Sequence, residues 1–490
     1  MVDSPARPPR VLLAPGLEVP RILTGLWQVA DMERGGAALD AEKAAAALGK
    51  YADAGFDAFD MADHYGSAEL IAGRYLAGAG RGRARAFTKW CPEPGPMTAE
   101  VVRAGVERSA ARLGVERIDL LQFHWWQYRH PGYLDAMLEL AKLREASRIA
   151  HLGLTNFDTD HLRLLVTHGI PVATNQVSFS LLDRRAAGRM SEFCKASGVK
   201  LLAYGTLGGG FLAERWVGAP EPSGIPDWSK SKYKRFIDAI GGWQVLQGIL
   251  AAAKAIADRH RVSVANVAAR WVLGHESVAA VIVGARLGER EHRADNLRAF
   301  SFALDAADHA RLDEAFSAAR DLPGDCGDEY RRPPFLTASG DLSHHLEAFP
   351  QVFDARPVDG RPGRLRVDSG SKWESLAGYS RAIRSGNRVL VSGTTATHGA
   401  GMVVCPGDPE AQTVYVLDKI GAALGALGGT LEDVVRTRIY VRDAALWEPV
   451  ARVHGRYFAD VRPVNTLLEF GALVGDYEVE IEAEAELGGG

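Results

Sequence analysis

The chain has 490 residues, of which 47% are hydrophobic and 24% charged, so it has the composition of a globular protein long enough for more than one domain. Its net charge of −4, without a Lys/Arg run, gives no reason to expect a nucleic acid or an anionic membrane surface as partner. No apolar run approaches the ~20 residues that span a bilayer, residues 1–10 lack an apolar secretory core and the cysteines are scattered, so we expect a cytoplasmic protein with reduced thiols (Cys91, Cys194, Cys326 and Cys405).

Between residues 22 and about 320, short apolar runs alternate with amphipathic stretches. Eight apolar strands separated by helices predict a parallel (β/α)8 TIM barrel, because strands covered on both faces appear as continuous apolar runs. A doubly wound sheet is the alternative, and it is disfavoured because no GxGxxG motif follows the first strand. The expected strands are 22–27, 58–62, 84–90, 119–124, 149–156, 172–179, 200–206 and 279–285, with helical spacing at 98–113, 133–146, 160–167, 184–197, 243–260, 264–273 and 305–319.

Polar side chains stand at the ends of the second, third and fourth expected strands. Asp60 and Tyr65 follow the second, Lys89 ends the third and His124 ends the fourth. A phenol donates a proton poorly at neutral pH unless a nearby cation stabilises its anion, which is a role for Lys89 held by Asp60. His124 would orient a carbonyl group. Any one of these residues alone is more simply a packed core residue, but the four together predict a proton-donating site.

Two segments after the seventh strand break the regular pattern. Residues 207–242 form a long insertion rich in Gly and Pro, which on a barrel lies at the ligand-binding face. Residues 321–371 form a linker or an ordered tail on the barrel, and the aromatic and apolar residues at 330–336 favour partial order. The adjacent His344 and His345 have no partner ligands in the sequence, so no metal site is expected.

Residues 372–490 have a different pattern, which predicts a two-layer α+β domain after a barrel domain at 1–320. A hairpin is expected at 382–391, helices at 410–427 and 446–458, and strands at 434–442, 466–470 and 477–487. The last strand alternates glutamates with apolar residues, while Arg436, Arg438 and Arg442 share one face of strand 434–442. If these strands pair, each cross-strand charge pair contributes roughly 0.2–1 kcal/mol.

The segments Asp60-Met61-Ala62-Asp63-His64-Tyr65-Gly66, Thr88-Lys89 and Asp119–His124 resemble the aldo-keto reductase superfamily, and the resemblance spans residues 10–320. It implies NADPH-dependent reduction of a carbonyl, with Tyr65 as proton donor and Asp60, Lys89 and His124 completing a tetrad. His292 stands where the family often has an arginine, and Leu287 where a serine is common. The implied cofactor-binding residues are Thr155, Asn156, Gln176, Tyr204, Gly205, Leu207, Gly209, Gly284, Arg286, His292 and Asn296.

Two of these assignments carry a physical expectation. Arg286 suits the 2′-phosphate of NADPH, because a guanidinium binds a phosphate bidentately. The glycines after Tyr204 would let the backbone approach the pyrophosphate. Tryptophans at or beyond the strand ends either wall the substrate pocket or pack in the core, and we expect Trp27, Trp90 and Trp125, with Trp126, in that wall.

Residues 372–488 resemble the Rid/YjgF family of small trimeric imine-deaminase-like proteins, through Gly378–Ala382, Val391-Ser392-Gly393, 434–443 and Glu480–Ala483. The resemblance implies a homotrimer with a second site near Tyr379, Ser392 and Glu480. The arginine that clamps a substrate carboxylate in that family corresponds to Asn465, and a neutral amide cannot replace this grip. The imine therefore lacks a carboxylate, or the domain serves to assemble trimers.

Three hypotheses follow for the whole chain. The barrel reduces an aldehyde, a ketone or an imine with NADPH, and the second domain trimerises it or processes a linked imine. Alternatively, the second domain hydrolyses an imine to the carbonyl that the barrel then reduces. In the third, the chain is a non-catalytic nicotinamide-binding scaffold, which the complete tetrad argues against.

Overall fold

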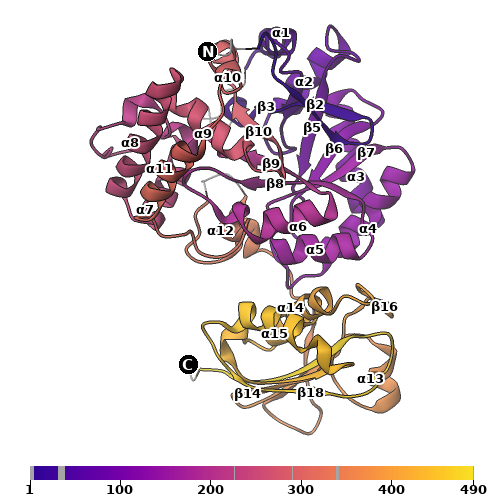
Figure 1. Ribbon diagram of the computed structural model, residues 1–490. Helices are drawn as coiled ribbons and strands as arrows, with labels where there is room; N and C mark the ends of the chain where they lie inside the picture. The colour runs from indigo at the N-terminus through magenta and orange to yellow at the C-terminus, as the bar shows by residue number, and fades with distance from the viewer. Residues whose placement is uncertain (1–4, 31–38, 226, 290, 338–341, 489–490) are drawn as a thin grey trace.

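The computed structural model describes residues 5–30, 39–225, 227–289, 291–337 and 342–488 (Figure 1). Eight parallel strands form a closed barrel in chain order, and β10 completes the ring by pairing with both β9 and β3. The predicted (β/α)8 barrel is thereby confirmed. Its strands are β3 (Ile22–Gly25), β4 (Ala58–Asp60), β5 (Arg85–Trp90), β6 (Ile118–Phe123), β7 (Ile149–Thr155), β8 (Val172–Ser178), β9 (Lys200–Tyr204) and β10 (Val278–Gly284).

Helices cover the outside of the barrel, and each expected helix is present. Their sequences explain where they begin: Thr98, Asp158 and Ser263 each cap a helix by accepting a hydrogen bond from its first turn. The helices are α1 (Ala41–Asp53), α2 (Ala68–Ala77), α3 (Ala99–Leu113), α4 (Gly132–Glu145), α5 (Thr159–Thr167), α6 (Arg189–Ser197), α7 (Trp228–Ile240), α8 (Trp243–His260), α9 (Val264–Leu273), α10 (Arg293–Arg298) and α11 (Ala306–Phe316).

A short hairpin that the sequence patterns did not predict closes the amino-terminal end of the barrel. It consists of β1 (Arg10–Ala14) and β2 (Leu17–Pro20). Its apolar side chains, such as Leu13 and Val19, form one cluster with Phe87 and Leu120 from barrel strands. The barrel interior is thus sealed at this end, which leaves the opposite end for a ligand.

The second unit is a seven-stranded sheet with α14 (Pro409–Ala426) and α15 (Trp447–Phe458) packed beside it (Figure 1). The sheet runs in the order β11, β12, β13, β14, β19, β17, β18, and the expected α+β architecture is confirmed. Two of its strands come from the segment expected as a linker or tail. The strands are β11 (Ala355–Pro357), β12 (Arg364–Val367), β13 (Ala382–Ser385), β14 (Arg388–Thr394), β17 (Val434–Val441), β18 (Val464–Glu469) and β19 (Val479–Glu486), and α13 (Lys372–Ala377) and the small ladder of β15 (Thr397–His398) with β16 (Met402–Val403) complete the unit.

The expected arginine–glutamate face is present. Strands β17 and β19 pair antiparallel, with Arg436 opposite Glu484 and Arg438 opposite Glu482. The Arg438 guanidinium lies 3.0 Å from the Glu482 carboxylate, and Arg436 lies 3.5 Å from Glu484. These pairs are partly exposed, so each contributes modestly to stability, but together they set the register of the two strands.

The two units share an interface in which α5 of the barrel packs against α14 (Figure 1). Arg163 Nε lies 2.9 Å from Asp408 Oδ2, and Arg456 Nε lies 2.9 Å from Asp160 Oδ2. Among the described helices none is long and apolar enough to cross a membrane alone; α7 and α8 reach that size only as a pair bent by 98°.

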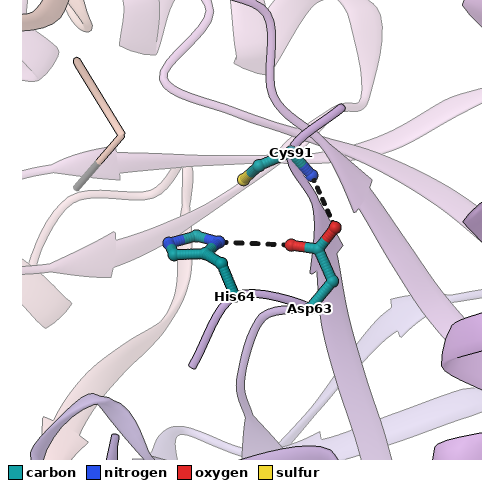
Figure 2. A group of neighbouring side chains, drawn as sticks. All are labelled: Asp63, His64 and Cys91. Carbon is teal, nitrogen blue, oxygen red and sulfur yellow. Dashed lines mark hydrogen bonds and ion pairs between the residues drawn. The ribbon is translucent and has the colours of Figure 1, made fainter. Parts of the chain in front are cut away.

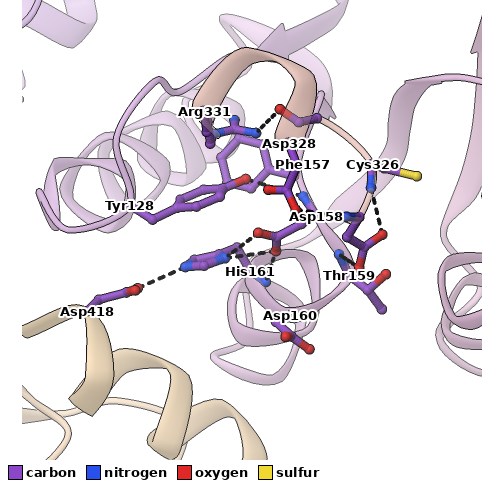
Figure 3. A network of polar contacts seen from close by, with 12 residues as sticks. Tyr128, Phe157, Asp158, Thr159, Asp160, His161, Cys326, Asp328, Arg331 and Asp418 are labelled. Atoms are coloured by element: carbon purple, nitrogen blue, oxygen red, sulfur yellow. Dashed lines mark hydrogen bonds and ion pairs between the residues drawn. The ribbon is translucent and has the colours of Figure 1, made fainter. Parts of the chain in front are cut away.

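His161 lies at the centre of this interface, between a carboxylate from each unit (Figure 3). Its Nδ1 lies 2.8 Å from Asp158 Oδ1 and its Nε2 lies 2.8 Å from Asp418 Oδ2. Burial alone lowers the pKa of His161, but the two carboxylates outweigh burial and raise it to about 10. The imidazole is therefore a cation at neutral pH, held between two anions.

This charge predicts a pH-dependent loss of stability. The stabilisation by His161 is complete below pH 6.5, where an unfolded histidine is also protonated, and disappears as the pH rises towards 10. Each unit of pKa difference corresponds to about 1.4 kcal/mol. Because Lys419, whose pKa burial lowers to about 7, titrates in the same range with the opposite sign, the useful quantity is a difference between variants.

We therefore expect the unfolding free energy of the wild type, measured with a chemical denaturant, to fall more steeply between pH 6.5 and 10 than that of His161→Gln. The neighbouring phenols do not titrate in this range, because burial raises the pKa of each well above 10 (Tyr128, Tyr133 and Tyr457). Parallel curves for the two proteins would mean that His161 is neutral.

Candidate active site

A cavity of about 870 Å³ opens at the carboxyl ends of the barrel strands. All four residues of the predicted tetrad line it: Asp60, Tyr65, Lys89 and His124. So do all the predicted cofactor-binding residues, from Thr155 on β7 to Asn296 on α10. The structure thus brings together residues that are far apart in the sequence, and it does so at the end of a barrel where ligands bind.

Asp60 and Lys89 form a buried ion pair on the cavity wall. Lys89 Nζ lies 2.6 Å from Asp60 Oδ2 and donates a second hydrogen bond to the Met61 carbonyl oxygen at 3.0 Å. The other oxygen of Asp60 accepts hydrogen bonds from Gln122 Nε2 at 2.9 Å and Gln176 Nε2 at 2.7 Å. Because both ions are buried and fully bonded, Lys89 is held in one position.

Tyr65 lies beside this ammonium. Lys89 Nζ is 5.0 Å from the centre of the Tyr65 ring. The rings of Trp27 and His64 contact Tyr65 edge-on, each at 4.8 Å between ring centres. The phenol is therefore held in the cavity next to a fixed positive charge, which stabilises a phenolate.

His124 is buried in the cavity wall at the end of β6. Burial, and to a lesser extent the charge of Arg331, hold the pKa of His124 well below its usual value, so the ring is neutral. Its Nδ1 lies 3.3 Å from the Thr155 carbonyl oxygen, while Nε2 has no hydrogen-bond partner among the described residues. A neutral ring carries one N–H: on Nε2 it donates to a carbonyl oxygen, and on Nδ1 it leaves Nε2 to accept from a hydroxyl.

The residues expected to hold the nicotinamide lie together on β7, β8 and β9. Asn156 follows β7 with a left-handed backbone (φ 59°), and its side-chain oxygen accepts a hydrogen bond from Tyr204 Oη at 2.8 Å. Thr155 Oγ1 donates to the Gln176 carbonyl oxygen at 3.3 Å. Since Gln176 also donates to Asp60, the nicotinamide-binding residues and the tetrad form one hydrogen-bonded unit.

The insertion at 207–242 folds over the glycine-rich segment as helix α7. Side chains of α7 explain the glycines: a Cβ at Gly205 would overlap the Tyr233 hydroxyl, and one at Gly209 would lie 2.7 Å from the Tyr233 ring. Both glycines also have positive φ. Their small size thus lets α7 approach the backbone, a requirement separate from the expected contact with a pyrophosphate.

At the far end of the cavity, Arg286 meets an acidic partner. Its guanidinium lies 3.1 Å from Asp227 Oδ2. Asp227 caps α7 by accepting a hydrogen bond from the Lys230 backbone N–H, and it also pairs with Lys230 Nζ at 2.9 Å. Two cations therefore share one carboxylate here, which leaves this end of the cavity with positive charge for an anionic group.

Two of the tryptophans expected in the pocket wall are elsewhere. Trp27 and Trp126 line the cavity, whereas Trp90 and Trp125 lie in the core. Trp90 packs so closely on α3 that a Cβ at Gly105 would be 2.5 Å from its indole nitrogen. Successive residues of a strand point in opposite directions, so a tryptophan that follows the inward-facing Lys89 must face the surrounding helices.

Asp63, His64 and Cys91 form a cluster of possible metal ligands at the cavity (Figure 2). Their ligand atoms lie within 4.8 Å of one another. Both carboxylate oxygens of Asp63 already have partners, because Oδ1 lies 3.2 Å from His64 Nδ1 and Oδ2 accepts from the Cys91 backbone N–H at 3.2 Å. We interpret the cluster as support for the loop that carries His64 and Tyr65.

Residues from the tail after the barrel also reach the cavity, and the sequence patterns did not identify them. Helix α12 (Asp328–Arg331) places Tyr330 in the wall, where its hydroxyl accepts a hydrogen bond from Lys232 Nζ at 2.6 Å. Glu329 Oε1 accepts from Tyr204 Oη at 3.2 Å. The aromatic content near residue 330 indicated order in this segment, but nothing in the sequence indicated that it crosses the barrel mouth.

The expected second site is only partly assembled within one chain. Glu480 lies against Gly393, where a Cβ would overlap its carboxylate, and it interacts electrostatically with Arg381. Ser392 Oγ donates to the Ser380 carbonyl oxygen at 2.8 Å, and Tyr379 is partly exposed. Asn465 donates instead to Thr437 Oγ1 at 3.0 Å, on the helix-covered face of the sheet.

Comparison with known proteins gives one match for each unit. A family model described as the Aldo/keto reductase family matches residues 21–316, and one described as Endoribonuclease L-PSP matches residues 370–487. A member of the YjgF/YER057c/UK114 family from Mycobacterium tuberculosis, of known structure, is 47% identical; the match covers 25% of this chain and 99% of that one, with a TM-score of 0.23.

Two curated relatives match the barrel. An aldo-keto reductase from Mycobacterium sp. (strain KMS) is 31% identical over 253 residues, which are 51% of this chain and 83% of that protein. Flagellar radial spoke protein 5 from Chlamydomonas reinhardtii is 31% identical over 213 residues, or 37% of this chain. The chain spans only 40% of the length of that relative.

Proposed function

Because the chain belongs to the aldo/keto reductase family through residues 21–316 and carries a Rid/YjgF-family domain at 370–487, we propose that it reduces the carbonyl group of a small molecule with NADPH. The observation that carries the proposal is the arrangement of one phenol, one buried ammonium and one neutral imidazole in a single cavity. Imines are a second substrate class for the same site. The four cysteines are unpaired, which fits a reducing, cytoplasmic environment.

Tyr65 is the proposed proton donor. As its proton moves to the substrate oxygen, the phenolate that forms is stabilised by the Lys89 ammonium, whose position Asp60 fixes. His124 Nε2 orients the same oxygen. Trp27 and Trp126 exclude water from the reacting atoms. NADPH, when bound, supplies the hydride.

The residues present fit this cofactor. Thr155, Asn156 and Gln176 offer amide and hydroxyl groups to a carboxamide at the inner end of the cavity. Arg286, with Lys230 nearby, offers positive charge at the outer end, where the 2′-phosphate distinguishes NADPH from NADH. His292 and Asn296 line the cavity on that side.

The cofactor preference is testable at Arg286. We expect Arg286→Ala to raise Kd for NADPH roughly tenfold or more, since hydrogen bonds to charged groups contribute about 1.5–3 kcal/mol, and to leave Kd for NADH nearly unchanged. Asp227→Asn is the matched control, because asparagine keeps the α7 cap but no longer neutralises Arg286, and it should tighten NADPH binding. Fluorescence titration measures both constants. An equal effect of Arg286→Ala on both cofactors would place the phosphate elsewhere.

For the second domain we propose trimer assembly. Strand β18 forms one edge of the sheet, and Val464, Leu468 and Phe470 project from one side of the chain with 62%, 52% and 61% of their surfaces exposed. An exposed apolar edge of this kind is a surface for another subunit. The replacement of the clamp arginine by Asn465 also favours assembly over processing of imino acids.

Light scattering of the full chain tests this assembly. We expect three times the monomer mass for the wild type and the monomer mass for Leu468→Glu, because a charge at the centre of an apolar subunit contact is left unpaired. Leu376→Glu is the control, since Leu376 is 77% exposed on α13, away from β18. A monomeric wild type at micromolar concentration would exclude the trimer.

The reductase activity itself is tested by following NADPH oxidation with a panel of aldehydes, ketones and imines. Turnover of at least one class is the expected result. If no compound is reduced although NADPH binds, the chain is a nicotinamide-binding scaffold rather than an enzyme.

A further inference from the structure

We propose that Asp418 of the second domain is a positioning residue for Asn156, so that the docking of the second domain sets the geometry of the nicotinamide end of the cavity. This inference rests on the proposed function, in which Asn156 binds the cofactor. It concerns the barrel as it exists in this chain, with a second domain packed on α5 (Figure 3).

The first route from Asp418 to the cavity is through hydrogen bonds. Asp418 Oδ2 lies 2.8 Å from His161 Nε2, and His161 Nδ1 lies 2.8 Å from Asp158 Oδ1. Asp158 is the N-cap of α5 and accepts the His161 backbone N–H at 2.7 Å. Asp158 is only two residues beyond Asn156, so the cap fixes where the loop between Asn156 and α5 begins and ends.

The second route is through stacked side chains. The His161 ring lies parallel to the Tyr128 ring, with 3.4 Å between ring centres. The Arg331 guanidinium covers Tyr128 at 4.2 Å from the ring centre and donates to the Asn156 carbonyl oxygen at 2.6 Å. Arg331 also donates to the Trp125 carbonyl oxygen. Both routes therefore start at His161 and meet at Asn156.

The burial of these groups makes the coupling strong. Asp418, His161 and Asp158 are each at most 5% exposed. Asp418 is held on its other side by the Tyr457 hydroxyl, which donates to Oδ1 at 2.9 Å. A change at Asp418 therefore cannot be absorbed by solvent and is transmitted to the charged His161 and its cap.

Other polar contacts of the interface do not lead to the cavity. Arg163 pairs with Asp408 at 2.9 Å, and Thr167 donates to Asp408 at 3.2 Å, both towards the carboxyl end of α5. This pair offers a matched control. Asp408→Asn removes a buried charge from the same interface but keeps the α14 cap that Asp408 provides.

The test compares Asp418→Asn with Asp408→Asn in the full chain. For Asp418→Asn we expect amide exchange of residues 155–157 to be about tenfold faster, a coupling of the size typical between linked sites, because the Asn156 N–H bonds the Gln176 carbonyl oxygen only while the loop is fixed. We also expect Kd for NADPH and for NADH to rise by the same factor. Asp408→Asn should change neither quantity.

A double variant locates the effect. If Asp418 acts through Asn156, Asp418→Asn should not weaken cofactor binding further in an Asn156→Ala background. If Asp418→Asn does not fold, Tyr457→Phe removes only the hydroxyl that holds Asp418 and should change exchange and Kd in the same direction. Unchanged exchange at 155–157, or an equal change in Asp408→Asn, would overturn the inference. Because exchange is measured without cofactor, failure to bind NADPH would reject the proposed function separately.

Discussion

Replacing Tyr65 with phenylalanine is expected to lower kcat for carbonyl reduction by about 10²–10⁴-fold, the range that a positioned general acid contributes. The substitution removes one oxygen atom and keeps the ring that packs edge-on against Trp27 and His64. The cavity should therefore keep its shape, and Kd for NADPH should stay near the wild-type value.

Steady-state NADPH oxidation and fluorescence titration measure these two effects separately. His64→Phe is a suitable control, because it changes the other side of the Tyr65 ring without removing the proton donor. A Tyr65→Phe enzyme that keeps most of its turnover would show that the proton comes from another group, of which His124 is the nearest candidate in the cavity wall.

The barrel and the tetrad were predictable because their signals are local. Each strand is a short apolar run, and a polar residue at its carboxyl end necessarily reaches the same face of a parallel barrel. Asp60, Lys89 and His124 could therefore be grouped before any contact was known. The same alternation of side chains along a strand could have corrected Trp90 and Trp125, because each directly follows a residue that faces the cavity.

What the sequence could not predict depends on contacts between distant segments. Lys232 and Tyr330 meet only because the insertion and the tail fold across the same barrel mouth. Likewise, His161 looks like an ordinary helix residue until Asp418, 257 positions later, is placed 2.8 Å from it. The hairpin of β1 and β2 is stabilised by the barrel interior that it covers, and its short strands carry little signal of their own.

Lys89→Met should produce two losses at once. The phenolate loses its stabilising cation, so kcat should fall by about 10²–10⁴-fold, as in Tyr65→Phe. In addition, the Asp60 carboxylate becomes a buried charge without a counterion, which costs about 3–5 kcal/mol of unfolding free energy. The side chain of methionine has a similar length, so little volume is lost.

The double variant Lys89→Met/Asp60→Asn separates these two losses. A neutral amide at position 60 removes the unpaired charge, so chemical denaturation should show part of the lost stability restored. Turnover should remain as low as in the single variant, because the cation is still absent. If Lys89→Met is as stable as the wild type, Asp60 carries no charge in the folded protein, and the role of Lys89 as a fixed ammonium beside Tyr65 fails with it.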